Sequence, residues 1–169
     1  MSAAPVVLAL RDESVGIIEL ARPDKFNCLS FAVHEGLGHA LTEFERSGSG
    51  VRVILLRAQG KQFCTGADLE EVRELRRNAE RLAGFMTLGH AVLRRFEAST
   101  LPVVAACQGL CLAGGLELML ACDVVFASRD ARFGDQHAQF GLVPGWGGSQ
   151  RLPRLVGLRR SLDLFYSAR

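Results

Sequence analysis

The sequence lacks both a strong excess of charge and a long apolar run. Its 169 residues include 20 Lys and Arg against 18 Asp and Glu, a formal net charge of +2. So weak a balance gives no electrostatic reason to expect nucleic acid or an acidic membrane surface as a partner. Arg52, Arg57 and Glu117 interrupt the most apolar stretches, so no run reaches the roughly 18 residues of a membrane-spanning helix. We expect neither a nucleic acid nor a membrane as partner.

Signals for export and for disulfide formation are also absent. Residues 1–5 contain no basic stretch followed by an apolar segment, so they do not resemble a signal peptide, and we expect a cytoplasmic location. The five cysteines are odd in number, have no CxxC spacing and lie mostly in apolar segments. This pattern favours reduced thiols packed in the core.

Several catalytic motifs are missing. The sequence has no GxxxxGK[ST] phosphate loop, no GxSxG nucleophile elbow and no GxGxxG after an expected strand. P-loop nucleotide hydrolysis, α/β-hydrolase chemistry and a dinucleotide-binding fold therefore have no support. His34 and His39 are five residues apart, whereas an HExxH zinc site needs a spacing of four. We expect no metal site.

The apolar residues that are present, 49% of the chain, predict an α/β fold. Short β-rich runs, one pair of which is typical of a hairpin, alternate with helical patterns; they cover residues 6–10, 15–20, 51–56, 102–106 and 124–127. We interpret the last three as buried strands. Alternation of strands and helices is typical of crossover connections in a parallel sheet, and the length suits one domain.

Two helices have clear starting signals. Ser30 can cap the first, whose apolar residues follow helical spacing as far as Phe44. Asp68 can cap the second, with Glu71 completing a capping-box pattern, and an apolar stripe continues from there to Phe96. A third helix is expected from about residue 114 to residue 121.

The starts of the second and third helices could form an anion site. Each follows an expected strand and loop, so each can present free backbone N–H groups at the positive end of a helix dipole. Glycine at position 114 would let a ligand oxygen approach the N–H group, as stabilisation of an enolate requires. Close packing of the helix against a strand would explain Gly114 equally well.

Glu117 is the one carboxylate in the apolar segment 116–120. It lies one helical turn after Gly114, so it can face the same ligand atom, and desolvation there would raise its pKa toward values useful for acid–base catalysis. The alternative is a buried structural carboxylate paired with an arginine or a backbone donor.

Six segments together resemble one known family. They are RPDKFN at 22–27, GKQFCTGAD at 60–68, GLCLAGGLE at 109–117, CD at 122–123, FG at 133–134 and GLVPGWGGSQR at 141–151. Their order and spacing are similar to those of the enoyl-CoA hydratase/isomerase, or crotonase, family over nearly the whole chain.

The resemblance implies an α/β fold of repeated ββα units, the ClpP/crotonase-type spiral, as a single core domain over residues 1–169. It also implies a homotrimer or a dimer of trimers. Family members usually continue into a C-terminal helical segment that covers the active site. Residues 151–169, with a helical pattern and five arginines, would be its start, so the chain resembles a shortened member.

The implied activity is hydration of a trans-2-enoyl-CoA to a 3-hydroxyacyl-CoA in fatty acid metabolism, without a metal or a separate cofactor. Coenzyme A enters only as part of the thioester substrate, whose carbonyl would lie between the N–H groups of Ala67 and Gly114. The expected coenzyme A surface comprises Lys25, Cys28, Ala67, Asp68, Leu69, Gly114 and Gly115. Isomerisation, dehydration, thioester hydrolysis or non-catalytic acyl-CoA binding on the same scaffold are alternatives.

One departure from the family concerns the catalytic pair. Glu117 matches one of the two glutamates of the hydratases, but the second position is His137 here. Glu117 could handle both proton transfers, His137 could supply the acid, or His137 could be a packed pocket residue. Asp135 is a further acid–base candidate. Trp146 could line the acyl pocket or anchor the surface.

Overall fold

The computed structural model describes residues 5–169, and its main feature is a five-stranded sheet in the order β1-β2-β3-β4-β6. The strands are β1 (Val7–Asp12), β2 (Val15–Leu20), β3 (Val53–Ala58), β4 (Val103–Cys107) and β6 (Val124–Ala127). β1 and β2 form the expected antiparallel hairpin, and every later pair is parallel. A second sheet pairs β5 (Leu110–Leu112) with β7 (Arg132–Gly134).

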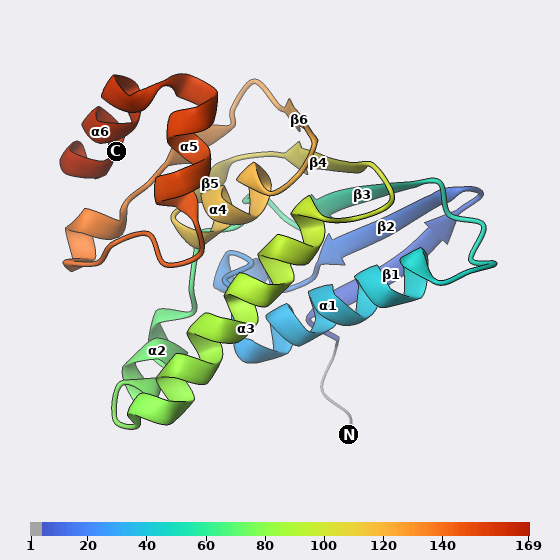
Figure 1. The fold of residues 1–169 in the computed structure, drawn as a ribbon, viewed down its shortest axis with the longest axis horizontal. Helices are drawn as coiled ribbons and strands as arrows, with labels where there is room; N and C mark the ends of the chain where they lie inside the picture. The colour runs from blue at the N-terminus through green and yellow to red at the C-terminus, as the bar shows by residue number, and fades with distance from the viewer. Residues whose placement is uncertain (1–4) are drawn as a thin grey trace.

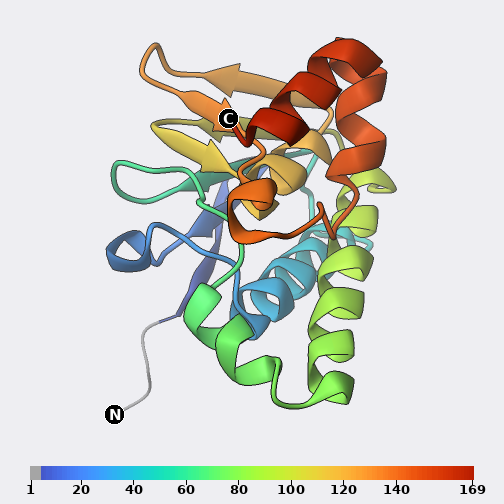
Figure 2. The ribbon, with the colours of Figure 1, turned by 90° about the vertical axis from the view of Figure 1, so that its left-hand side faces the viewer.

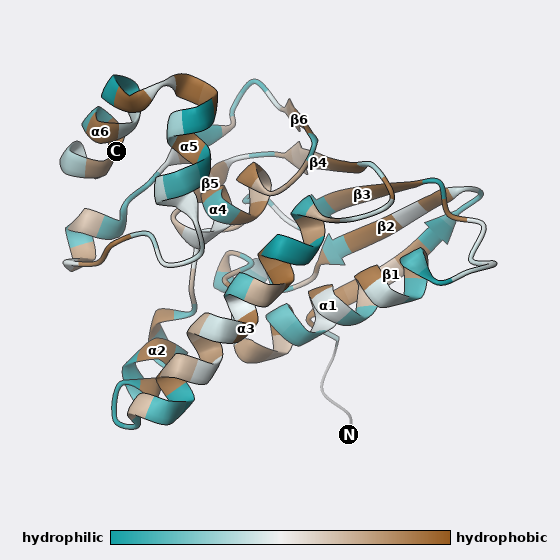
Figure 3. Ribbon diagram, viewed as in Figure 1, coloured by the Kyte–Doolittle hydropathy of each residue, from teal (hydrophilic) through white to brown (hydrophobic). Residues whose placement is uncertain are grey.

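Helices cover one side of the main sheet (Figures 1 and 2). They are α1 (Phe31–Glu45), α2 (Leu69–Leu75), α3 (Ala79–Glu97), α4 (Gly114–Leu120), α5 (Gly148–Val156) and α6 (Leu158–Ser167). Short 3₁₀ helices lie at Pro23–Lys25 and His137–Phe140. The core lies between this layer and the sheet, with Ile18, Ile54 and Leu93 fully buried. Most of β3 is hydrophobic (Figure 3), and its Ile54 and Leu56 are fully buried.

The predicted α/β fold with ββα units is confirmed. β1, β2 and α1 form one such unit, and β4, β5 and α4 form another. Ser30 caps α1 by accepting a hydrogen bond from Val33 N, as its position predicted. All five cysteines are free thiols, and burial raises the pKa of Cys64 to about 12.

Three expectations about the elements were wrong in part. The stripe from residue 69 to residue 96 is two helices, because Asn78 accepts from Arg81 N and starts α3 afresh. Asp68 does cap α2, but Glu71 accepts a hydrogen bond from Phe31 N and does not complete the capping box. The last expected strand, β6, was interpreted as buried but is an exposed edge strand, since within residues 5–169 it pairs only with β4.

The short strands β5 and β7 are absent from the sequence-based expectation. Each is three residues long and pairs only with the other, so neither leaves a recognisable period in the sequence. Strand β3 begins at Val53, two residues later than expected. No helix within residues 5–169 is long and apolar enough to cross a lipid bilayer.

Candidate active site

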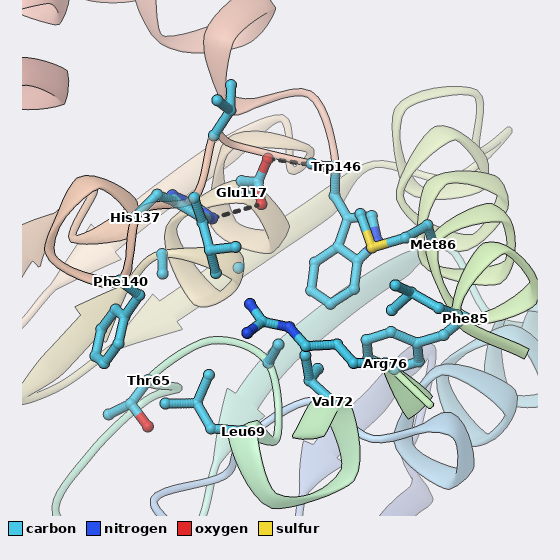
Figure 4. Close-up of a pocket in the computed structure, with 17 residues that line it drawn as sticks. Thr65, Leu69, Val72, Arg76, Phe85, Met86, Glu117, His137, Phe140 and Trp146 are labelled. Carbon is cyan, nitrogen blue, oxygen red and sulfur yellow. Dashed lines mark hydrogen bonds and ion pairs between the residues drawn. The ribbon is translucent and has the colours of Figure 1, made fainter. Parts of the chain in front are cut away.

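A cavity of about 240 Å³ opens between the N-termini of α2 and α4 and the loop that precedes α5 (Figure 4). Its polar side chains are those of Thr65, Arg76, Glu117 and His137. Apolar residues form most of the remaining wall, among them Leu82, Phe85, Met86, Phe140, Leu142 and Val143. Ala67 and Gly114, the two residues expected to supply N–H groups, also line this cavity.

Ala67 and Gly114 are brought together by a close approach of their two loops. An added β-carbon at Gly66 would lie only 3.2 Å from the backbone nitrogen of Gly114, and Gly66 has a φ of +102°. Within residues 5–169, neither the Ala67 N–H nor the Gly114 N–H donates a backbone hydrogen bond. Two free donors at one cavity wall are the arrangement that an oxyanion requires.

The turn from β5 into α4 is strained at the residue before Gly114. Ala113 has a φ of +49°, which is in the left-handed region that glycine favours. Its N–H donates to Gly134 O at 2.9 Å, so pairing with β7 holds the turn in place. Strain of this kind, typically about 1–3 kcal/mol, is concentrated at functional sites. Here it lies at the residue directly before the first N–H group of α4.

Glu117 is held by one carboxylate oxygen and presents the other to the cavity. Its Oε1 accepts hydrogen bonds from Trp146 N and Gly148 N, both at 2.8 Å. Its Oε2 is buried, has no hydrogen-bond partner within residues 5–169 and lies 3.6 Å from His137 Nε2. Burial raises the pKa of Glu117, against the opposing effect of the Gly148 N–H, the His137 imidazole and the Trp146 N–H.

His137 is oriented by Asp135. The His137 Nδ1 lies 2.9 Å from Asp135 Oδ2, and the same carboxylate accepts from the His137 backbone N at 3.3 Å. An ionised carboxylate only accepts hydrogen bonds, so Nδ1 is the donor and Nε2 faces Glu117. Burial alone would lower the pKa of His137, but the hydrogen bond to Asp135 and the charge of Glu117 outweigh it and raise the pKa. The dashed lines in Figure 4 show the Glu117 contacts.

Trp146 is part of the cavity wall and is not a surface anchor. Only 3% of its surface is exposed. Its indole packs closely against two glycines. A β-carbon added to Gly89 would lie 2.4 Å from the indole Nε1, and one added to Gly114 would lie 2.6 Å from the indole Cζ3. His34 and Phe85 pack edge-on against it, with ring centroids 4.7 and 5.3 Å from that of Trp146.

Five of the seven residues expected to form the coenzyme A surface lie at or beside the N-terminal end of α2, and the other two, Gly114 and Gly115, begin α4. Lys25 forms an ion pair with Glu70 at 2.8 Å, and Asp68 forms one with Arg22 at 3.0 Å. Leu69 is 47% exposed and lines the cavity. Cys28 is buried beside Asp68, and burial raises its thiol pKa to about 11.

Gly115, also expected on that surface, does not line the cavity. A β-carbon there would approach Cys64 O to 2.2 Å, so close packing against the loop before α2 accounts for this glycine. The structure therefore separates the two neighbouring glycines: Gly114 faces the cavity and Gly115 faces Cys64.

Comparison with known proteins agrees with the resemblance drawn from the motifs. The family model described as enoyl-CoA hydratase/isomerase matches residues 11–169. The chain belongs to this family. It is 36% identical over 162 residues to a short-chain-enoyl-CoA hydratase of Clostridium acetobutylicum, covering 96% of this chain and 61% of that protein. It is also 33% identical over 162 residues to a crotonyl-CoA hydratase of Syntrophomonas wolfei, covering 96% of this chain and 62% of that protein.

Solved structures of the family share the fold. An enoyl-CoA hydratase from Bacillus anthracis matches with a TM-score of 0.91 and 35% identity, over 97% of this chain and 63% of that chain. A putative enoyl-CoA hydratase from Streptomyces coelicolor gives a TM-score of 0.90 with 32% identity. The match covers 100% of this chain and 64% of that chain. The predicted ClpP/crotonase-type fold is thereby confirmed. The chain spans about three fifths of the length of these relatives.

Sequence reasoning missed two features of this cavity. The N–H groups that hold Glu117 come from Trp146, in the loop before α5, and from Gly148, the first residue of α5. They are 29 and 31 residues away in the chain, and no local pattern indicates such a contact. Arg76 directly follows the last residue of α2 and lines the cavity. The sequence predicted one continuous helix here, so it did not indicate that Arg76 stands at a helix end beside the cavity. A charged residue at the end of a short helix gives no such signal.

Proposed function

We propose that the protein catalyses the addition of water to a trans-2-enoyl-CoA, giving a 3-hydroxyacyl-CoA. The observation that best supports this is the placement of the free Glu117 Oε2 and the His137 Nε2 at the wall that also presents the Ala67 and Gly114 N–H groups. Membership of the enoyl-CoA hydratase/isomerase family supports the same substrate class.

In the proposed reaction Glu117 is the general base. Its Oε2 accepts a proton from a water molecule as the water oxygen bonds to Cβ of the enoyl group. Electrons move through Cα to the thioester oxygen, which becomes an enolate. The backbone N–H groups of Ala67 and Gly114 then donate to that oxygen, in a cavity whose wall is mostly apolar.

His137 supplies the second proton. It begins as the imidazolium, a state that Asp135 and the Glu117 carboxylate favour. Its Nε2 gives a proton to Cα as the enolate collapses back to the thioester. The proton gained by Glu117 then returns to His137 across the 3.6 Å separation, which restores both groups. One water is consumed, and no electron leaves or enters.

The proposal includes the binding of coenzyme A along the N-terminal end of α2, next to Lys25, Cys28, Asp68 and Leu69. It needs no metal or separate cofactor for the chemistry, because dipoles and two proton carriers suffice. A homotrimer or a dimer of trimers is also proposed. Apolar side chains exposed at the edge strand and at α5 and α6 support association, among them Val124, Phe126, Leu155, Leu158 and Tyr166.

Product analysis distinguishes hydration from related reactions. Crotonyl-CoA is incubated with the protein, and the products are separated by chromatography and identified by mass. We expect 3-hydroxybutyryl-CoA, one water heavier than the substrate. Free coenzyme A would instead indicate thioester hydrolysis. Conversion of a 3-enoyl-CoA to its 2-enoyl isomer without hydration of crotonyl-CoA would indicate an isomerase. Thioester binding without any product would contradict enzymatic activity.

A further inference from the structure

The cavity contains one cation that the proposed hydration does not use. Arg76 lines the cavity together with apolar residues such as Leu69, Val72 and Phe85. In Figure 4 its guanidinium group extends into the space between the wall of Leu69 and Val72 and the wall of Glu117 and His137. Arg76 is itself exposed, and its positive charge beside a mostly apolar wall favours a ligand that carries a negative charge at that place.

Arg76 has no anionic partner within residues 5–169. The three glutamates of its own helix are engaged elsewhere: Glu70 pairs with Lys25, Glu71 accepts from Phe31 N, and Glu74 pairs with Arg77. Glu117 lies on the opposite wall, and its nearest cationic group is His137. The guanidinium therefore keeps all its donors free for a ligand.

The position of Arg76 along α2 separates it from the expected coenzyme A surface. The ion pairs of Lys25 and Asp68 mark that surface at the start of the helix. Arg76 follows the last residue of α2. The helix has seven residues, each rising about 1.5 Å, so the backbone of Arg76 lies about 10 Å from the start of α2 along the helix axis. Arg76 lines the same cavity as Ala67, Gly114 and the apolar residues Leu82, Phe85 and Met86. With the thioester carbonyl at Ala67 and Gly114, an acyl chain that packs on those apolar residues therefore has Arg76 within the same cavity.

We propose that Arg76 recognises a carboxylate at the distal end of the acyl chain, so that the preferred substrates are enoyl-CoA thioesters of dicarboxylic acids. Arginine binds a carboxylate through two parallel N–H···O bonds, which fixes the end of a short chain as well as neutralising its charge. The inference rests on the proposed function for the position of the thioester carbonyl. It adds a requirement that family membership does not supply.

The test is a binding comparison with unreactive thioesters, so that it does not depend on turnover. Calorimetry measures the dissociation constants of glutaryl-CoA, pentanoyl-CoA and free coenzyme A for the 169-residue chain and for R76M. We expect glutaryl-CoA to bind the unmodified chain about tenfold or more tightly than pentanoyl-CoA, a preference that R76M abolishes. R76K should restore part of it, and free coenzyme A should bind all variants equally.

R73M is the matched control. Arg73 lies on the same helix and does not line the cavity, so its loss changes the net charge equally but leaves the preference intact. Equal binding of glutaryl-CoA and pentanoyl-CoA by the unmodified chain would overturn the inference and leave hydration untouched. Uniform weakening of all three ligands in R76M would assign Arg76 to a coenzyme A phosphate and also overturn it. Failure of the unmodified chain to bind any of the ligands would overturn both proposals.

Discussion

Gly114 lies directly against the indole ring of Trp146. A β-carbon at Gly114 would approach Trp146 Cζ3 to 2.6 Å and Gly66 Cα to 3.4 Å. The sequence alone left close helix packing and access of a ligand to the N–H group as alternative reasons for glycine at position 114, and the structure is consistent with both. The glycine permits close packing, and it leaves its own N–H group open to the cavity.

Substitution of Gly114 by alanine should damage both stability and the site. We expect G114A to lower the free energy of unfolding by about 1–3 kcal/mol, because the buried indole must shift to make room. Urea unfolding measures this change. Gly84 is the matched control, since it also lies in a helix but has no atom within 4 Å of an added β-carbon. G84A should raise stability by about 0.5–1 kcal/mol, because alanine favours the helix. Equal effects of the two substitutions would contradict the packing described for Gly114.

The hydrogen bond between Asp135 and His137 predicts a change in the pH profile of hydration. His137 must be protonated to act as the acid, so activity is lost as the pH rises through its pKa. Asp135 raises that pKa, so D135N should move the alkaline limb of the profile to lower pH. Turnover between pH 5 and pH 9 with crotonyl-CoA measures the shift. D130N, which changes an exposed aspartate, should leave the profile where it is. An unmoved limb in D135N would exclude His137 as the proton donor.

Buried His34 predicts a loss of stability in acid. Its pKa is lowered from 6.5 to about 4 by burial, and neither ring nitrogen has a partner within residues 5–169. Between these values the unfolded chain binds a proton that the folded chain does not, so stability falls as the pH falls from 6.5 toward 4. The loss attributable to this residue approaches about 3 kcal/mol.

Comparison of two histidine variants isolates this effect. H34L should remain as stable as the unmodified chain at pH 7. It should lose less stability on acidification, because the buried imidazole with the lowered pKa is then gone. H39Q changes an exposed histidine of the same helix and should follow the unmodified chain. The readout is the free energy of unfolding in urea at several pH values. Parallel curves for H34L and the unmodified chain would show that His34 titrates normally.

The sequence predicted the elements that depend on local chemistry. Ser30 and Asp68 cap helices because a short oxygen-bearing side chain at that place satisfies free N–H groups, wherever the helix lies in the fold. The family motifs also predicted that Ala67, Gly114, Glu117 and His137 share one site, and all four line the same cavity.

Features that depend on tertiary contacts could not be predicted in this way. The Glu71 side chain does not complete the capping box, because it accepts a hydrogen bond from the backbone N–H of Phe31, 40 residues earlier in the chain. Strand β6 is apolar yet exposed, because its exposure depends on its place at the edge of the sheet and not on its composition. Arg76 lines the cavity from the break between α2, which ends at Leu75, and α3, which Asn78 caps, and this break depends on how the two helices pack in the fold.

The central claim is that Glu117 Oε2 removes a proton from the attacking water. In E117Q the side chain keeps its shape and one oxygen for the N–H groups of Trp146 and Gly148, but it loses the base. The most direct test follows the loss of enoyl-thioester absorbance of crotonyl-CoA with the unmodified chain, E117Q and the exposed control E74Q. We predict a turnover at least about a hundredfold lower in E117Q, with crotonyl-CoA affinity within about twofold of the unmodified chain and E74Q unchanged. Equal turnover in E117Q and the unmodified chain would contradict the account.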